Sequence, residues 1–229
     1  MKTTYTIDNG NSHPHVGIFK GVTLEKVIPL KECLFEEINS EIILSSVGMD
    51  LNLSLHNIFD AKKLRTETHF LDMPVNYTQT LGIDRLCCSH FVFKNKIKEN
   101  ERVLLIDAGT FTTFDIVSRA GLEGGFIFPG LQTFLNAYSG GRNLIRLNLN
   151  DLKLNEKFSL PHSTEEAIGE ATKIYFQMTL KAMVDKYNPD MIITTGGEGH
   201  FFSATNFIPH LIHQALFEIN NSISDKTVH

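Results

Sequence analysis

Hydrophobic positions alternate with polar ones in several short runs of the first hundred residues. The run TYTID at 4–8 leads into the turn-forming letters NGNS, and an extended pattern continues over 16–19 and 24–30. The apolar run EIILSS at 41–46 is typical of a buried strand, and HFLDM at 69–73 has the pattern of a further strand. We therefore expect a sheet in this half of the chain.

Helical spacing interrupts these strands. Over 31–39 apolar residues recur at helical intervals, part of 55–65 is expected to form a second short helix, and 82–98 a third. The first half is thus predicted to mix strands and helices.

The same order begins again after residue 100. Strands are predicted first, followed by a short helix, a longer helix, a strand that ends in a glycine pair, and a helical tail. Ser163 or Thr164 is expected to cap the longer helix. The strands cover 102–107, 112–118, 124–130 and 190–197, and the helices cover 131–139, 165–186 and 210–220.

The two halves also share a short local sequence. IDNGNS at 7–12 has the layout of IDAGTF at 106–111, with an Asp at the end of the first strand and a Gly two residues later. Because the match falls at corresponding places in the same strand order, a duplicated unit is the simplest explanation. We expect two domains, 1–100 and 101–229.

Composition and charge narrow the class of protein. The 229 residues are 42% hydrophobic and 21% charged, as in ordinary globular domains, and the formal net charge is -5. No apolar stretch approaches the ~20 residues of a membrane helix, and the first residues lack the apolar core of a secretory signal. The three cysteines show no CxxC spacing. We expect a cytoplasmic protein with no nucleic-acid or membrane partner, no disulfide framework and no zinc site.

The turn after Asp8 is the first candidate for chemistry. A turn containing Gly and Asn can direct backbone N–H groups inward as a nest for phosphate oxygens, and Asn11 and Ser12 add side-chain donors. Asp8 itself can hold Mg²⁺ through water. The ordinary alternative is a plain Asn-Gly hairpin turn. The second copy at 107–110 favours a nucleotide cleft, to which the strand end Thr-Gly-Gly at 195–197 would add a close backbone approach.

Asp84 is the third carboxylate of interest. It stands at a predicted helix start, where an Asp often acts only as a helix-end charge that stabilises by ~0.3–1 kcal/mol. A phosphoryl-transfer site, however, needs a carboxylate that orients and deprotonates the attacking hydroxyl.

These motifs, taken in order, resemble those of type III pantothenate kinases. Asp-x-Gly turns occur throughout the actin-like ATPases, whereas their combination with Gly-x-Asp-Arg and Gly-Gly-x-Ile-x-Pro-Gly is far more specific. The resemblance runs from about residue 5 to the C-terminus. The motifs are D-x-G-N-S at 8–12, G-x-D-R at 82–85, D-x-G-T at 107–110, GGxIxPG at 124–130 and TGG at 195–197.

The resemblance implies a fold and an activity. The fold is α/β, a duplicated actin-like (ribonuclease H-like) fold with two βββαβα-type domains and a nucleotide cleft between them. The activity is ATP-dependent phosphorylation of pantothenate, the first step of coenzyme A synthesis, by a homodimer that uses Mg²⁺ and a monovalent cation, K⁺ or NH₄⁺.

The resemblance also implies roles for particular residues. By the resemblance, Asp84 is expected to be the general base, and Asp107 the ligand of the monovalent cation. Asp8 is expected to lie near Mg²⁺. The residues expected to bind ATP are Asp8, Asn9, Gly10, Asn11, Ser12, His13, Pro14, His15 and Thr110. Those expected to bind pantothenate are Tyr77, Gly82, Ile83, Asp84, Arg85 and Thr164, although Thr164 can equally be a helix cap.

The chain departs from the family pattern in three places. The run before Gly82 is shorter than usual and lacks a Pro, so Tyr77 can instead be a half-buried residue at a strand end. His13 and His15 stand where many relatives have an apolar residue or Lys. The chain is short, with the loss concentrated in 48–80. That segment supports an alternative acceptor, a sugar or another small alcohol; a second alternative is a catalytically weak accessory factor of gene expression.

Overall fold

The computed structural model describes residues 2–10, 12–34, 42–48, 58–202 and 206–224. Its contacts define two compact units. The first contains Met1–Asn100, Val117–Gly124 and His210–His229, and the second contains Glu101–Ile116 and Gly125–Pro209. The C-terminal segment therefore belongs with the first half of the chain, which the expected boundary between residues 100 and 101 does not provide for.

The first unit is built on a 5-stranded sheet with the order β3-β2-β1-β4-β5. β1 runs antiparallel to β2 and parallel to β4, and β5 continues the parallel pairing. The strands predicted over 4–8, 16–19, 24–30 and 41–46 are confirmed. The strands are β1 (Thr3–Asn9), β2 (His15–Lys20), β3 (Thr23–Pro29), β4 (Ile42–Ser46) and β5 (Ile58–Asp60).

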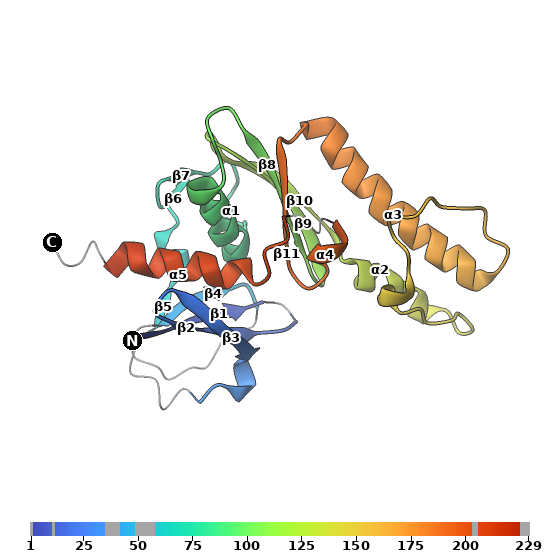
Figure 1. Ribbon diagram of the computed structural model, residues 1–229, viewed down its shortest axis with the longest axis horizontal. Coiled ribbons are helices and arrows are strands. Elements are labelled where there is room, and N and C mark those ends of the chain that lie inside the picture. Colours follow the sequence, from blue (N-terminus) through green and yellow to red (C-terminus); the bar gives the residue numbers. More distant parts are fainter. Residues whose placement is uncertain (1, 11, 35–41, 49–57, 203–205, 225–229) are drawn as a thin grey trace. The chain divides into compact units, whose positions relative to one another are not determined.

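Two helices pack on this sheet and on each other. α1 (Ile83–Asn95) and α5 (Leu211–Ser224) lie side by side, with α5 against β1 and β4 (Figure 1). The ring of Phe217 on α5 stacks on that of Phe19 on β2, with centroids 4.2 Å apart. Both helices were predicted, and α5 completes the core of the first unit.

Of the two predictions for the segment before α1, one is confirmed and one is wrong. The short helix expected within 55–65 is present as a 3-10 helix (Ala61–Leu64), preceded by β5, whose residues extend the sheet beside β4. The expected single strand over 69–73 is a hairpin of β6 (His69–Phe70) and β7 (Met73–Pro74), with Leu71 in the left-handed region.

The helix expected over 31–39 is described only at its start. A 3-10 turn (Leu30–Glu32) stands there, and residues 35–39 lie outside the described part of the chain.

The second unit contains a 4-stranded sheet with the order β10-β9-β8-β11, in which β11 is parallel to β8. Its first three strands and the later parallel strand follow the same order as β3-β2-β1-β4, as a duplication predicts. The end of β9 and the start of β10 belong to the first unit. The strands are β8 (Arg102–Ala108), β9 (Phe111–Ser118), β10 (Gly121–Pro129) and β11 (Met191–Thr195).

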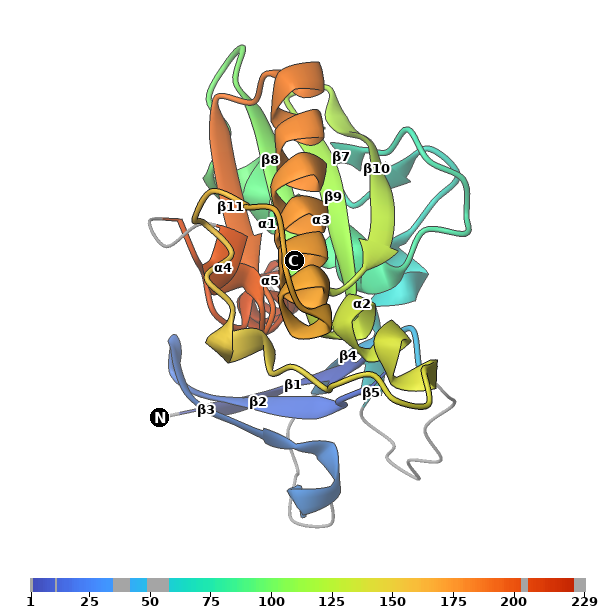
Figure 2. The same cartoon turned by 90° about the vertical axis from the view of Figure 1, so that its right-hand side faces the viewer.

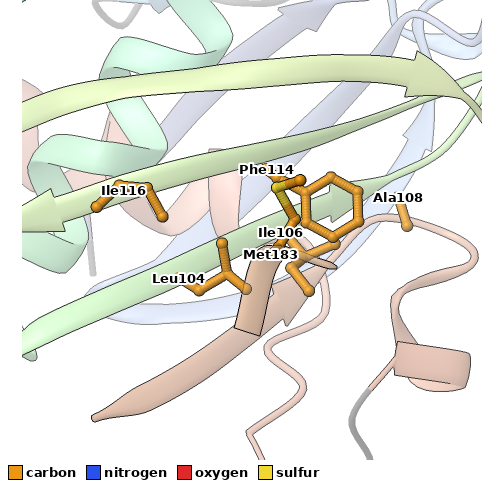
Figure 3. Close-up of a cluster of buried hydrophobic side chains, with 6 residues drawn as sticks. All are labelled: Leu104, Ile106, Ala108, Phe114, Ile116 and Met183. Atoms are coloured by element: carbon orange, nitrogen blue, oxygen red, sulfur yellow. The ribbon is translucent and has the colours of Figure 1, made fainter. Parts of the chain in front are cut away.

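The long helix α3 (Thr164–Tyr187) lies along this sheet (Figure 2). Met183 of α3 packs into a cluster with Leu104, Ile106 and Phe114 (Figure 3). Ser163 caps α3 by accepting a hydrogen bond from the Glu166 N–H at 3.1 Å, as one of the two predicted caps. The shorter helices are α2 (Leu131–Ala137) and α4 (Gly199–Phe202), with 3-10 turns at Tyr138–Gly140 and Leu149–Asp151.

Within the described residues, no helix is both long and apolar enough to span a membrane.

Candidate functional site

The turn between β1 and β2 follows Asp8. Asp8 pairs in register with His15, and its Oδ2 lies 3.8 Å from Nδ1 of His15. Ser12 and His13 are exposed, and Pro14 is partly buried. Asn11, expected to bind ATP, lies outside the described residues. The structure thus places an acidic strand end beside an imidazole, with the exposed residues Ser12 and His13 between them in the sequence.

The segment at residues 46–48 is hydrogen-bonded to Asn9 at the start of this turn. The Asn9 carbonyl accepts hydrogen bonds from the N–H groups of Val47 and Gly48 at 3.1 and 2.9 Å, and Nδ2 of Asn9 donates to Ser46 Oγ at 2.7 Å. A Cβ on Gly48 would lie 2.8 Å from the Gly10 carbonyl oxygen. The carbonyl and the side chain of Asn9 therefore both connect the start of the turn to residues 46–48. Sequence reasoning did not single out Gly48, although a Gly directly after a buried strand is the signal that would have found it.

Asp84 stands in the first turn of α1. Its Oδ1 accepts a hydrogen bond from the Arg85 N–H at 2.8 Å, and a Cβ on Gly82 would lie 2.4 Å from that same oxygen. Burial raises the pKa of the Asp84 carboxyl, against the opposing hydrogen bond and the charge of Arg85. The carboxylate is therefore desolvated, as befits a group that accepts a proton.

Asp8 and Asp84, the two carboxylates predicted for the site in this unit, both affect the pKa of the buried Cys87 thiol. The Cys87 thiol is fully buried on α1, and burial raises its pKa well above the usual value. The negative charges of Asp84, Asp8 and Asp60 raise the pKa of this thiol further. The charges of Asp8 and Asp84 thus both act on this thiol in the first unit.

Tyr77 lies beside the Gly-x-Asp-Arg segment. The guanidinium of Arg85, which is 6% exposed, stacks over the Tyr77 ring at 5.4 Å from the centroid. Nη2 of Arg65 donates to the Tyr77 carbonyl at 2.9 Å. Tyr77 is half-buried, as the alternative of a residue at a strand end predicts. Its ring also contacts Arg85, one of the residues expected to bind pantothenate.

Asp107 occupies the equivalent strand end in the second unit. It is half-buried on β8 and pairs in register with Thr195 of β11. Gly196 has a φ of 81°, and a Cβ there would lie 2.6 Å from Oδ1 of Asp107 and 2.3 Å from the Ala108 carbonyl oxygen. Gly196, the first glycine of the pair predicted at the end of β11, therefore packs directly against the Asp107 carboxylate.

The turn after Asp107 is held by residues from α2. The Thr110 carbonyl accepts hydrogen bonds from the Gly130 N–H at 3.0 Å and from Oγ1 of Thr133 at 2.7 Å. The Glu198 carboxylate accepts from the N–H groups of Leu131 and Gln132 at the start of α2, at 2.8 and 3.1 Å. Burial raises the pKa of Glu198. Glu198 was missed in the sequence, where its only signal was its place directly after the glycine pair.

Thr164, in contrast, is exposed at the first residue of α3. Ser163, and not Thr164, accepts the capping hydrogen bond. Within the described part of the chain, no hydrogen bond joins Thr164 to the turn after Asp107.

The donor atoms at these strand ends suit hard cations. The described residues contain no group of three or more His, Cys, Asp and Glu side chains that could hold a metal. A single carboxylate is enough for Mg²⁺ when phosphate and water oxygens supply the other ligands, so Asp8 fits this role. The Asp107 carboxylate, beside a residue without a side chain, offers oxygen to a cation such as K⁺.

One protein family, described as type III pantothenate kinase, matches the sequence over residues 22–186. The chain belongs to this family. A type III pantothenate kinase of Aquifex aeolicus is 25% identical over 92% of this chain and 94% of its own length, and that of Azobacteroides pseudotrichonymphae is 26% identical over 93% and 94%. The Campylobacter jejuni (strain RM1221) member is 26% identical over 80% of this chain and 79% of its own length.

Solved structures that share the fold include the following two. One, from Campylobacter jejuni and described as a Baf family transcriptional activator, has a TM-score of 0.62 at 22% identity and covers 96% of this chain and 99% of its own. The other, from Sinorhizobium meliloti and described as a 2-dehydro-3-deoxygalactonokinase, has a TM-score of 0.58 at 9% identity with the same coverage. Both structures share the α/β fold that the resemblance implied.

Proposed function

We propose that this member of the type III pantothenate kinase family transfers the γ-phosphoryl group of ATP to the primary hydroxyl of pantothenate, the first step of coenzyme A synthesis. The observation that carries the proposal is the desolvated Asp84 carboxylate, fixed between Gly82 and the Arg85 N–H at the start of α1.

Asp84 takes the proton of the attacking hydroxyl while the oxygen of pantothenate forms its bond to phosphorus and ADP leaves. A carboxylate whose pKa is raised is a better base for this step than one fully exposed to water. Gly82, Ile83, Arg85 and Tyr77 line the acceptor site, and Thr164 is assigned to it by the resemblance alone.

ATP is held by the turn from Asp8 to His15, with Thr110 as a further contact. Mg²⁺ near Asp8, and a monovalent cation at Asp107, would offset the negative charge of the phosphates. The backbone N–H groups of the turn supply hydrogen bonds to phosphate oxygens. The expected nucleotide cleft, the homodimer, the cytoplasmic location and the choice between K⁺ and NH₄⁺ are parts of this proposal.

The test is ADP release by the purified protein with ATP and Mg²⁺, with and without pantothenate, in potassium, ammonium and sodium buffers. We expect release that needs pantothenate and that is faster in potassium or ammonium than in sodium. Asp84→Asn is expected to lower kcat by about 10²- to 10⁴-fold, the usual contribution of a general base, while ATP binding persists. Asp185→Asn, which changes an exposed carboxylate on α3, is the matched control.

Other outcomes point to the alternatives. If ATP binds but pantothenate adds nothing in any buffer, the acceptor is wrong, and sugars and other small alcohols should be compared in the same assay. If neither ATP binding nor ADP release is found, the activity itself is refuted. An accessory role in gene expression would then be the reading to pursue, since the structural neighbour from Campylobacter jejuni is described as a transcriptional activator.

A further inference from the structure

A chain of hydrogen bonds connects the core of the first unit to the phosphate-binding turn. Nε2 of His213 lies 3.0 Å from Nδ1 of His15, and Nδ1 of His213 lies 2.7 Å from Oγ1 of Thr6. Thr6 and His213 are completely buried, whereas the His15 side chain is 27% exposed. The chain therefore runs from a buried hydroxyl to an imidazole at the surface, on the strand that directly follows the turn.

The fold makes room for this arrangement. His213 reaches β1 and β2 from α5, and it fits because residue 17 is a glycine. A Cβ on Gly17 would lie 2.6 Å from Cγ of His213 and from Oγ1 of Thr6. A buried imidazole that faces the backbone of a glycine and bonds at both ring nitrogens has one orientation only.

Burial and the nearby imidazoles lower the pKa of both groups. Burial lowers the pKa of His213 well below the usual value, and the charges of His15 and His210 lower it further. Burial also lowers the pKa of His15, with added effects of His210 and His13. The Asp8 carboxylate, 3.8 Å from His15, is the acidic group at this end of the chain.

Two arrangements of protons fit these distances. If the Thr6 hydroxyl donates to the Gly17 carbonyl at 3.4 Å, Nδ1–H of His213 donates to Thr6, and Nε2 of His213 accepts from Nδ1–H of His15. If the Thr6 hydroxyl donates to Nδ1 of His213 at 2.7 Å, Nε2–H of His213 donates to Nδ1 of His15, and His15 carries its proton on Nε2. The second arrangement leaves His15 with a donor that can face an anion.

We propose that His213 is a positioning residue for ATP: it holds His15 so that Nε2–H of His15 donates a hydrogen bond to a phosphate oxygen at the turn from Asp8 to His15. This inference rests on the proposed ATP-binding function. His15 touches the nucleotide, and His213 acts only through His15.

The first experiment measures the dissociation constant of a non-hydrolysable ATP analogue with Mg²⁺, together with kcat and the KM of both substrates. His213→Met keeps a large side chain at this buried place on α5, but that side chain is apolar and cannot donate to His15. We expect it to weaken analogue binding about two- to tenfold, the effect of one neutral hydrogen bond, and to raise the KM of ATP equally. The KM of pantothenate and kcat should change little. His213→Gln, whose amide nitrogen can still donate, should recover most of the loss.

A double-mutant cycle separates positioning from a general structural effect. His15→Ala alone should weaken analogue binding as much as His213→Met, and the pair should be no worse than either single variant. Thr6→Val alters the buried end of the chain without touching ATP. It should reproduce the His213→Met effect, and Thr6→Ser should not, which keeps the test informative if His213→Met unfolds.

Two results would overturn the inference while the proposed function stands: unchanged analogue binding in His15→Ala, or a further loss when His213→Met is added to His15→Ala. A wild-type protein that binds the analogue but ignores pantothenate would refute the acceptor alone. A wild-type protein that binds no analogue would refute both.

Discussion

Gly82 lies directly against the carboxylate of Asp84, so close that a Cβ on residue 82 would sit 2.4 Å from Oδ1. The carboxylate can fold back to the Arg85 N–H only because residue 82 has no side chain. The glycine of the Gly-x-Asp-Arg motif thus determines where the proposed base points. Its φ is -60°, an ordinary value, so space and not backbone conformation requires the glycine here.

Gly82→Ala is therefore expected to displace the Asp84 carboxylate. A displacement of about 1 Å can cost on the order of 10²-fold in rate, so we expect kcat to fall at least tenfold with little change in ATP affinity. Steady-state kinetics and analogue binding check this. Gly140→Ala is the control, because a Cβ there meets no atom within 4 Å. Wild-type kcat in Gly82→Ala would contradict the assigned position of the base.

The acid side of the pH profile should report Asp84. The base acts only when it is deprotonated, and burial raises its pKa. We expect kcat/KM for pantothenate to fall, as pH decreases, at a higher pH than an exposed aspartate would give. Rates measured from pH 8 downwards at saturating ATP, with circular dichroism to confirm folding, test this. The residual activity of Asp84→Asn should lack this decrease.

Asp84 should also lower the stability of the protein at neutral pH. Between the usual pKa of an aspartate and its raised folded value, the folded chain binds more protons than the unfolded chain, so the free energy of unfolding falls as pH rises through this window. Asp84→Asn removes the buried charge, and we expect a higher melting temperature than wild type at pH 7. The difference should shrink at pH 4 and below. A less stable Asp84→Asn at pH 7 would show that the charge is compensated.

Tyr77 is expected to support Arg85 through its ring and not through its hydroxyl. A cation stacked on an aromatic face is worth about 0.5–2 kcal/mol, so Tyr77→Leu should raise the KM of pantothenate several-fold by releasing the Arg85 guanidinium. Tyr77→Phe keeps the ring and should stay within twofold of wild type. If Tyr77→Phe is as damaging as Tyr77→Leu, the hydroxyl itself contacts the substrate.

The first unit should depend on α5 for its stability. Phe217 is 8% exposed and stacks on Phe19, and deleting such a ring typically costs about 3–5 kcal/mol. We expect Phe217→Ala to lower the midpoint of urea unfolding strongly. Val22→Ala, at a side chain that is 83% exposed, should leave it almost unchanged. Equal midpoints for both variants would show that α5 is dispensable to the core.

Local patterns predicted the longer helices and the strands of both sheets except β5. The alternation around Ile7 and the apolar run that contains Ile106 each describe a strand that pairs with the next strand along the chain. The cap at Ser163 was also predictable, because a cap bonds to a backbone group only three residues away.

Features that depend on distant partners were not predictable. Ile58 joins the sheet only because β4 offers it a free edge, and Leu71 adopts its left-handed conformation only within the β6–β7 hairpin. The carboxylates at the ends of β1 and β8 were identified from motifs, since each follows a buried strand. Glu198 and His213 were not, because their partners lie 66 and 198 residues away in the sequence.

The return of α5 to the first unit sets the order in which the protein can form on the ribosome. β1 is synthesised before residues 101–209, and α5, which packs on it, is synthesised after them. The second unit lies entirely within residues 101–209, so it can fold before α5 emerges. The side of the N-terminal sheet that carries Thr6, Gly17 and Phe19 must meanwhile wait without the helix that covers it. During synthesis this sheet is therefore a part of the chain that a chaperone would protect.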